Sequence, residues 1–130
     1  MNGYSFFAPT KVLFGAGKLS ELGAQKLPGT KALIVTTGGN SVKRFGYLGR
    51  VEAELDRAGV AHELFDRIEP NPLRETVNAG GWMARTHGCD FVLALGGGSV
   101  MDGSKGICAV AANPHTDAEG NECPGDIWAK

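Results

Sequence analysis

Long apolar runs are missing from this sequence. Nowhere in its 130 residues does a hydrophobic stretch approach the roughly 18 residues that a membrane-spanning helix needs. The N-terminus also lacks the basic segment followed by an apolar one that marks a secretory signal. These two absences predict a cytoplasmic protein with no membrane partner.

An excess of charge of either sign is missing as well. The chain carries 13 Lys and Arg against 14 Asp and Glu, a formal net charge of -1. The two signs are interspersed, so no basic patch is available to neutralise a phosphate backbone or an anionic membrane surface. Nucleic acid is therefore not an expected partner.

Cysteine is scarce, and its spacing is uninformative. The three cysteines are Cys89, Cys108 and Cys123. An odd number with no Cys-x-x-Cys pair argues against a disulfide framework and against a zinc knuckle. Cys89 and Cys108 are most simply small residues that pack in the core.

Glycine, by contrast, is abundant: 20 residues, about twice the usual share. The glycines lie between apolar runs, as expected for repeated connections between strands and helices. The pattern predicts strands at residues 32–35, 61–65 and 91–95, and helices at 18–27, 48–58, 73–85 and 100–111. Alternation of this kind predicts an α/β fold: a doubly wound, Rossmann-like parallel sheet with helices on both faces.

The two ends of the chain depart from this alternation. Residues 5–7 and 11–14 predict an N-terminal hairpin or a bent strand. The periodicity stops after residue 112, so residues 112–130 are expected to be a polar loop that leads to the capped start of a helix at 126–130. We interpret residues 1–130 as one nucleotide-binding domain, and the abrupt end predicts a fragment or a truncated protein.

The most informative segment is the glycine-rich turn after the strand at residues 91–95. Three glycines, Gly96, Gly97 and Gly98, separate that strand from the following helix. Backbone N–H groups and the positive end of the helix dipole converge there and favour an anion such as a phosphate. The turn is neither a Rossmann fingerprint, since Met101 replaces the third glycine, nor a P-loop. The alternative is a tight turn that binds nothing.

The motifs resemble one known family. GGGSVMDGSK at residues 96–105, preceded by GCDF at 88–91, resembles the signature of the iron-dependent (group III) alcohol dehydrogenases. KVLFGAG at residues 11–17 and EPNP at 69–72 are similar to further family motifs in the same order. GGNSVK at 38–43 resembles the branch of butanol dehydrogenases and aldehyde reductases. The resemblance implies the N-terminal cofactor-binding domain of such an enzyme.

The resemblance also implies roles for individual residues. Gly97, Gly98 and Ser99 would hold the cofactor pyrophosphate. Asp102 would approach the nicotinamide ribose, or alternatively serve only the helix dipole. Asn71 would lie near the nucleotide, or alternatively form an Asx turn between two prolines.

The cofactor expected from this resemblance is NADP(H) rather than NAD(H). Family members that prefer NAD carry an acidic side chain just after the first Rossmann-type strand, and residues 38–43 have none. Gly38, Gly39, Ser41 and Lys43 can instead admit and neutralise a 2′-phosphate. The alternative for Lys43 and its neighbour Arg44 is a solvated helix start.

No metal ligands and no catalytic residues are expected in this chain. In the family, a separate helical domain supplies an Asp and three His to an iron or zinc, and those positions are absent here. Only His115 has Asp117, Glu119 and Cys123 nearby in sequence, and these are read as a solvated loop rather than as a metal site.

Three functions therefore stay open. The first is the NADP(H)-binding domain of an alcohol dehydrogenase or aldehyde reductase, with a small alcohol or aldehyde as substrate of the intact enzyme and little activity of its own. The second is a free-standing, non-catalytic nucleotide-binding module. The third is a small oligomeric oxidoreductase that uses a different electrophile. A face that a helical domain normally covers also predicts a homo-oligomer.

Overall fold

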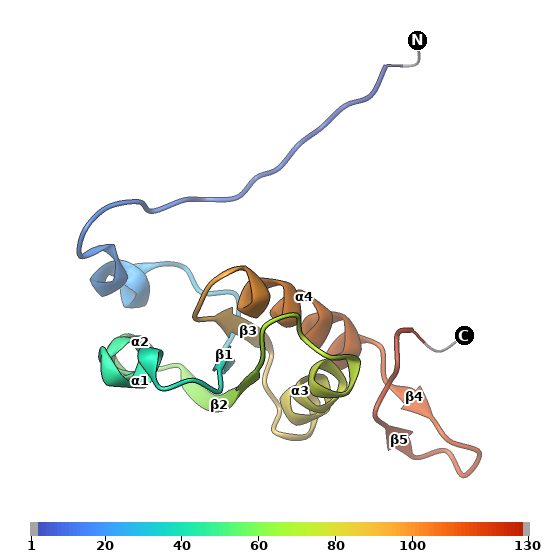
Figure 1. Cartoon of the computed structure of the whole chain (residues 1–130). Coiled ribbons are helices and arrows are strands. Elements are labelled where there is room, and N and C mark those ends of the chain that lie inside the picture. The colour runs from blue at the N-terminus through green and yellow to red at the C-terminus, as the bar shows by residue number, and fades with distance from the viewer. Residues whose placement is uncertain (1–2, 129–130) are drawn as a thin grey trace.

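A three-stranded parallel sheet forms the centre of the chain (Figure 1). The structure, a computed structural model, describes residues 3–128. The strands are β1 (Lys31–Thr37), β2 (Ala61–Ile68) and β3 (Phe91–Ala94), in the order β2-β1-β3. The central strand β1 is buried over residues 32–36, as its uninterrupted apolar run predicts.

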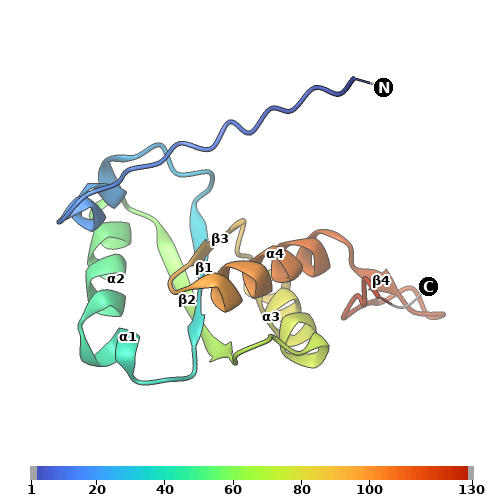
Figure 2. The same cartoon turned by 45° about the horizontal axis from the view of Figure 1, so that its top comes forward.

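Helices cover both faces of this sheet. The helical segments are the 3-10 helix η1 (Lys18–Ala24) and the α-helices α1 (Ser41–Arg44), α2 (Tyr47–Arg57), α3 (Arg74–Thr86) and α4 (Gly98–Ala112). Figure 2 shows α2 on one side of the strands and α3 with α4 on the other. The predicted doubly wound α/β fold is confirmed.

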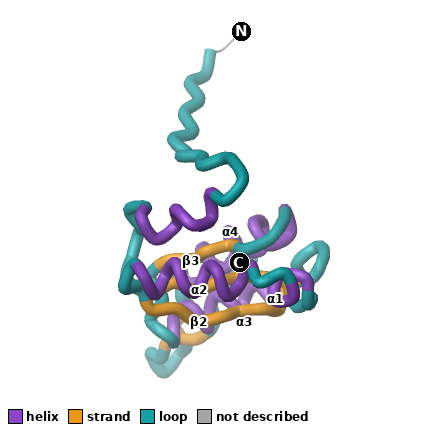
Figure 3. Tube along the Cα trace, turned by 90° about the vertical axis from the view of Figure 1, so that its left-hand side faces the viewer, coloured by secondary structure: helices purple, strands orange, loops and turns teal. Residues whose placement is uncertain are grey.

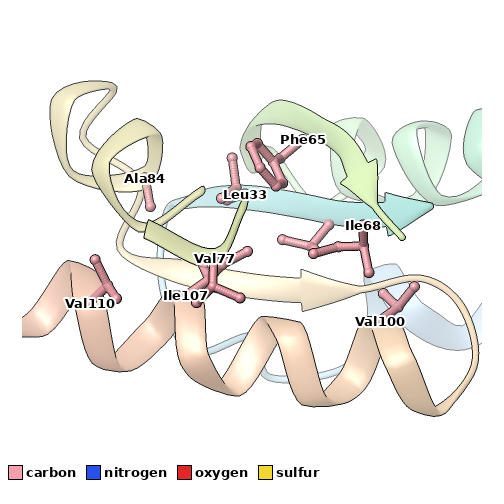
Figure 4. Close-up of a cluster of buried hydrophobic side chains, with 9 residues drawn as sticks. Leu33, Phe65, Ile68, Val77, Ala84, Val100, Ile107 and Val110 are labelled. Atoms are coloured by element: carbon pink, nitrogen blue, oxygen red, sulfur yellow. The ribbon is translucent and has the colours of Figure 1, made fainter. Parts of the chain in front are cut away.

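Each face of the sheet has its own hydrophobic core because successive strand side chains point to opposite sides. Leu33 and Val35 of β1 pack with the residues of α3 and α4 shown in Figure 4. Ala32 and Ile34 pack instead with buried leucine and valine side chains of α2. The alternation within one strand therefore ties the two helical layers to a common centre.

Two glycines let α3 and α4 approach closely. A Cβ on Gly80 would come within 2.5 Å of the Ile107 Cδ1 atom. A Cβ on Gly81 would come within 2.5 Å of the Val110 Cβ atom and 3.1 Å of the Ile107 carbonyl oxygen. Side chains at these positions would push α3 and α4 apart, so the glycines allow the two helices to pack closely.

The N-terminal hairpin expected at residues 5–14 does not form. Residues 3–14 contain no strand and extend away from the sheet as an arm (Figure 3). Tyr4, Phe6, Phe7 and Phe14 of this arm are almost fully exposed. An isolated two-stranded hairpin is marginal in water, and no strand of the sheet lies beside this segment to extend the pairing.

The segment expected to be a polar loop after residue 112 contains a short hairpin. Strands β4 (His115–Thr116) and β5 (Glu122–Cys123) pair in antiparallel fashion. The Asp117 carboxylate accepts N–H bonds from Glu119 and Asn121 and so closes the turn between them.

The helix start expected at residues 126–130 is described only as far as Trp128. The Trp128 N–H donates to the Asp126 carboxylate at 3.0 Å, as at a helix N-cap. Residues 129–130 of this expected helix lie outside the described residues.

Between residues 3 and 128, no helix combines the length and the apolar character needed to cross a bilayer.

The close approach of α3 and α4 gives a stability prediction. Gly81→Ala should destabilise the fold by about 1–3 kcal/mol because the added methyl group overpacks the contact with α4. Gly49→Ala, in α2 with open space at its Cβ position, is the matched control and should stabilise by about 0.5–1 kcal/mol. Urea unfolding of both variants measures the difference, and equal effects would show that α4 does not depend on this contact.

Candidate functional site

Two loops leave the same edge of the sheet side by side. β1 pairs with β3 so that Val35 lies opposite Ala94, and the Leu95 N–H donates to the Val35 carbonyl at 2.9 Å. The Thr36 hydroxyl donates to the Leu95 carbonyl at 2.7 Å. The turn at residues 96–99 and the loop at 38–41 therefore begin together at the carboxyl ends of adjacent strands.

This edge is also the place where the chain reverses its direction across the sheet. β2 lies on one side of β1 and β3 on the other. In open α/β sheets, ligands bind outside the carboxyl ends of the strands at such a switch point. The topology thus defines one candidate site for a ligand.

A pocket of about 250 Å³ opens at this position. Its lining comes from the ends of β1 and β2, the residues just after β2 and the start of α4: Thr37, Ile68, Glu69, Pro70, Gly97, Gly98, Ser99 and Val100. Of the residues expected to bind cofactor, the structure brings Gly97, Gly98 and Ser99 to this pocket. The others, Gly38, Gly39, Ser41, Lys43, Asn71 and Asp102, do not line it.

The glycines of the turn fall into two kinds. A Cβ on Gly96 would come within 2.6 Å of the Val100 Cγ2 atom, so internal packing requires this glycine. Cβ atoms on Gly97 and Gly98 would meet nothing within 4 Å. The protein itself has no need for glycine at these two positions, and the open space in front of them is where a ligand would touch the backbone.

The N-terminus of α4 provides anion-binding groups at this open space. Gly97 is the N-cap residue, and no side chain caps the helix. The first backbone N–H groups of a helix have no partner within the helix and, with the dipole, favour a phosphate. The turn therefore fits a pyrophosphate, and a side chain at Gly97 or Gly98 would occupy the space it needs.

The loop after β1 is held against the end of β2. The Gly39 N–H donates to the Thr37 hydroxyl at 2.8 Å. The Gly38 N–H donates to the Ile68 carbonyl at 3.4 Å, and a Cβ on Gly38 would lie 3.2 Å from the Asp66 carbonyl oxygen. The loop is thus fixed in place by contacts with the end of β1 and with the end of β2.

A carboxylate lies beside this loop although the loop contains none. The Lys43 Nζ atom donates to the Asp66 Oδ2 atom at 2.5 Å. This hydrogen bond from Lys43 lowers the pKa of Asp66. Asp66 lies outside residues 38–43, so the absence of an acid within that segment does not reveal it. The available signal was its place near the end of the second strand, because the carboxyl ends of neighbouring parallel strands lie together.

Asn71 occupies the left-handed backbone region, with φ of 55°. Its side chain is exposed. The Leu73 N–H, which an Asx turn at Asn71 would bind, donates instead to Glu69 at 3.1 Å. The Thr76 hydroxyl also donates to Glu69 at 2.8 Å, and these bonds lower the pKa of that carboxyl. Glu69 thus fixes this wall of the pocket to the start of α3.

Asp102 lies farther along α4 than the sequence suggested. Because α4 begins at Gly98 rather than at residue 100, Asp102 falls beyond its first turn. Its side chain is 75% exposed and lies 3.6 Å from the Lys105 Nζ atom. Asp102 is therefore not a first-turn residue of α4, and its interaction with the helix dipole is correspondingly weaker.

Residues 3–128 do not contain a metal site. No three His, Cys, Asp or Glu side chains in this part of the chain come together as ligands. Near the hairpin, the Asp117 carboxylate is bonded to Asn121, and the Cys123 thiol lies 3.4 Å from the His115 carbonyl. The described residues therefore do not fit an iron or zinc ion.

Comparison with known proteins identifies the family. Residues 9–126 match the family described as iron-containing alcohol dehydrogenase. The chain therefore belongs to the iron-containing alcohol dehydrogenase family, and the resemblance drawn from its motifs is confirmed.

Individual relatives match nearly the whole chain but only part of themselves. The chain is 42% identical to NADH-dependent butanol dehydrogenase A of Clostridium acetobutylicum over 98% of its length, which is 30% of that enzyme. It is 40% identical to the NADPH-dependent aldehyde reductase YqhD of Escherichia coli over 88% of its length, which is 29% of that enzyme. The crystal structure of the alcohol dehydrogenase ADH/D1 from an archaeon of a Red Sea brine pool superposes with a TM-score of 0.81 at 38% identity, covering 93% of this chain and 30% of that one. The chain thus spans about 30% of the relatives it matches.

The two kinds of glycine in the turn can be separated by their effect on folding. Gly96→Ala should destabilise by about 1–3 kcal/mol because its methyl group meets Val100. Gly97→Ala should change stability by less than about 0.5 kcal/mol, since its Cβ enters open space. Thermal or urea unfolding measures both, and a large loss of stability in Gly97→Ala would mean that the fold itself requires this glycine.

Proposed function

We propose that this chain is the nucleotide-binding part of an alcohol dehydrogenase or aldehyde reductase that transfers a hydride between a nicotinamide cofactor and a small alcohol or aldehyde. The open space at Gly97 and Gly98, in front of the uncapped N-terminus of α4, carries this proposal. The names of the relatives, a butanol dehydrogenase and an aldehyde reductase, support the substrate class.

The residues of the chain act by binding and orienting the cofactor. Backbone N–H groups of residues 97–99 hold the pyrophosphate, while Ile68 and Pro70 form the apolar wall of the pocket. Glu69 keeps that wall attached to α3. The bound nicotinamide supplies the hydride chemistry. None of the described residues is assigned a catalytic role, so the chain alone is expected to bind nucleotide with little or no turnover.

NADP(H) is the proposed cofactor. The loop that contains Gly38, Gly39 and Ser41 has no carboxylate of its own to repel a 2′-phosphate, and Lys43 can neutralise one. The relatives include enzymes named as NADH-dependent and as NADPH-dependent, so this choice rests on the loop itself. Asn71 and Asp102 are proposed to contact the nucleotide from outside the pocket lining.

Self-association is proposed for the arm at residues 3–14. Phe6, Phe7 and Phe14 are each at least 85% exposed. Apolar surface of this extent marks an interaction site, and a second copy of the chain supplies an identical arm for a symmetric contact. Sedimentation should show a dimer or higher oligomer that a triple substitution of these residues to Ser converts to monomer; a monomeric parent would refute self-association.

Replacing Gly98 by Val tests whether the turn at residues 97–99 binds the pyrophosphate. The branched side chain fills the space in front of the helix N-terminus, so affinity for NADPH and NADH should fall at least about tenfold, or about 1.4 kcal/mol. Gly49→Val is the matched control, since its Cβ position is also open but lies on α2. Titration of reduced-nicotinamide fluorescence measures both. Undiminished binding by Gly98→Val would show that the glycines serve only the turn.

Replacing Lys43 or Ser41 by Ala tests the choice of cofactor. Each change should weaken NADPH binding about three- to tenfold, because a contact to the 2′-phosphate is lost. NADH lacks this phosphate, so its affinity should stay nearly the same. Parallel titrations with the two nucleotides distinguish these outcomes, and equal weakening of both would contradict the assignment of this loop to the 2′ position.

A further inference from the structure

The loop at residues 38–41 is bordered by two opposite charges from different elements. Lys43 belongs to the short helix α1, and Asp66 belongs to β2. Their side chains meet at 2.5 Å, and both stay partly open to solvent, with 47% and 34% of their surfaces exposed. The backbone of Gly38 lies against the backbone of Asp66. A group bound at this loop would therefore lie near both the Lys43 ammonium group and the Asp66 carboxylate.

Stability gives no sufficient reason for this ion pair. Exposed pairs of this kind contribute about 0–1 kcal/mol, because water screens them and two long side chains must be held still. The cation next in sequence, Arg67, points to the opposite face of the sheet, with its guanidinium 5.7 Å from the centre of the Phe65 ring. Lys43 is thus the cation that faces Asp66.

Asp66 and Lys43 have opposite preferences for the 2′ position of an adenosine ribose. A carboxylate accepts a hydrogen bond from a 2′-hydroxyl and repels a 2′-phosphate. An ammonium group attracts the phosphate but loses that ability while it is bonded to a carboxylate. The hydrogen bond from Lys43 lowers the pKa of Asp66, and an Asp carboxyl is ionised at neutral pH even at its ordinary pKa.

We propose that Asp66 is a specificity-determining residue that limits the preference of this chain for NADPH over NADH, by repelling the 2′-phosphate and by holding Lys43. The proposal rests on the proposed nucleotide-binding function. Asp66 lies in β2, so the residues of the 38–41 loop alone do not reveal its effect on cofactor choice. The NADP(H) preference is then set by the balance of both charges.

The test is Asp66→Asn in the full 130-residue chain, titrated with NADPH and with NADH by fluorescence. The amide keeps the shape of the side chain and removes its charge. We expect the ratio of NADPH to NADH affinity to rise about tenfold, and to rise more at low ionic strength. In a Lys43→Ala background the same change should raise the ratio less, because no lysine is released.

Two further variants serve as controls. Glu119→Gln removes the same unit charge in the turn between β4 and β5, away from the loop, and should leave the ratio unchanged. Asp66→Ser removes the carboxylate in a second way and should reproduce the rise, whether or not the Asn variant folds well. Thermal unfolding of each variant confirms that folded protein is being compared.

The outcomes separate this inference from the function on which it rests. If the parent chain binds neither nucleotide, the proposed function fails and the role of Asp66 fails with it. If the parent binds but Asp66→Asn and Asp66→Ser change the ratio by less than about twofold, Asp66 has no part in specificity while the nucleotide site stands. A rise of equal size in Glu119→Gln would attribute the effect to net charge and would also overturn the role of Asp66.

Discussion

Burial of β1 on both faces and both edges is the constraint on which the rest of the structure depends. Residues 32–36 have no measurable exposure, so this strand needs neighbours on each side and helices above and below it. β2 and β3 pair with β1 on its two sides. α2 covers one face of the sheet, and α3 and α4 cover the other. The carboxyl ends of three parallel strands then meet at one edge, and the pocket follows from that arrangement.

The approach of α4 to the sheet determines how closely its N-terminus faces the pocket. Besides the glycines of α3, two glycines of α4 lie in tight contact: a Cβ on Gly103 would come within 2.9 Å of Ile68, and one on Gly106 within 2.7 Å of Val77. Glycine lowers helix propensity, so these positions reduce the intrinsic stability of α4. The close packing that they allow keeps the helix start beside the ends of β1 and β2.

The sequence predicted what depends on local pattern and missed what depends on tertiary contact. The three parallel strands and the glycine turn were predicted correctly, since apolar runs and the residues that interrupt them act over a few positions. The arm at residues 3–14 also has strand character, but pairing needs a neighbour that the sequence does not reveal. The charge environment of the 38–41 loop was missed because the register of β2 against β1, with Thr37 opposite Ile68, brings Asp66 there.

In the proposed function, main-chain groups bind the cofactor and side chains discriminate between NADPH and NADH. The turn at residues 97–99 offers main-chain N–H groups, which respond to the charge of a pyrophosphate and are insensitive to the group at the distant 2′ position. The proposed discrimination then depends on side chains beside the neighbouring loop, where one charge comes from α1 and the other from β2. These side chains hold neither the sheet nor the turn together. They can therefore be substituted without loss of the phosphate-binding turn at residues 97–99. A fold of this kind can thus serve either nicotinamide dinucleotide with one phosphate-binding turn.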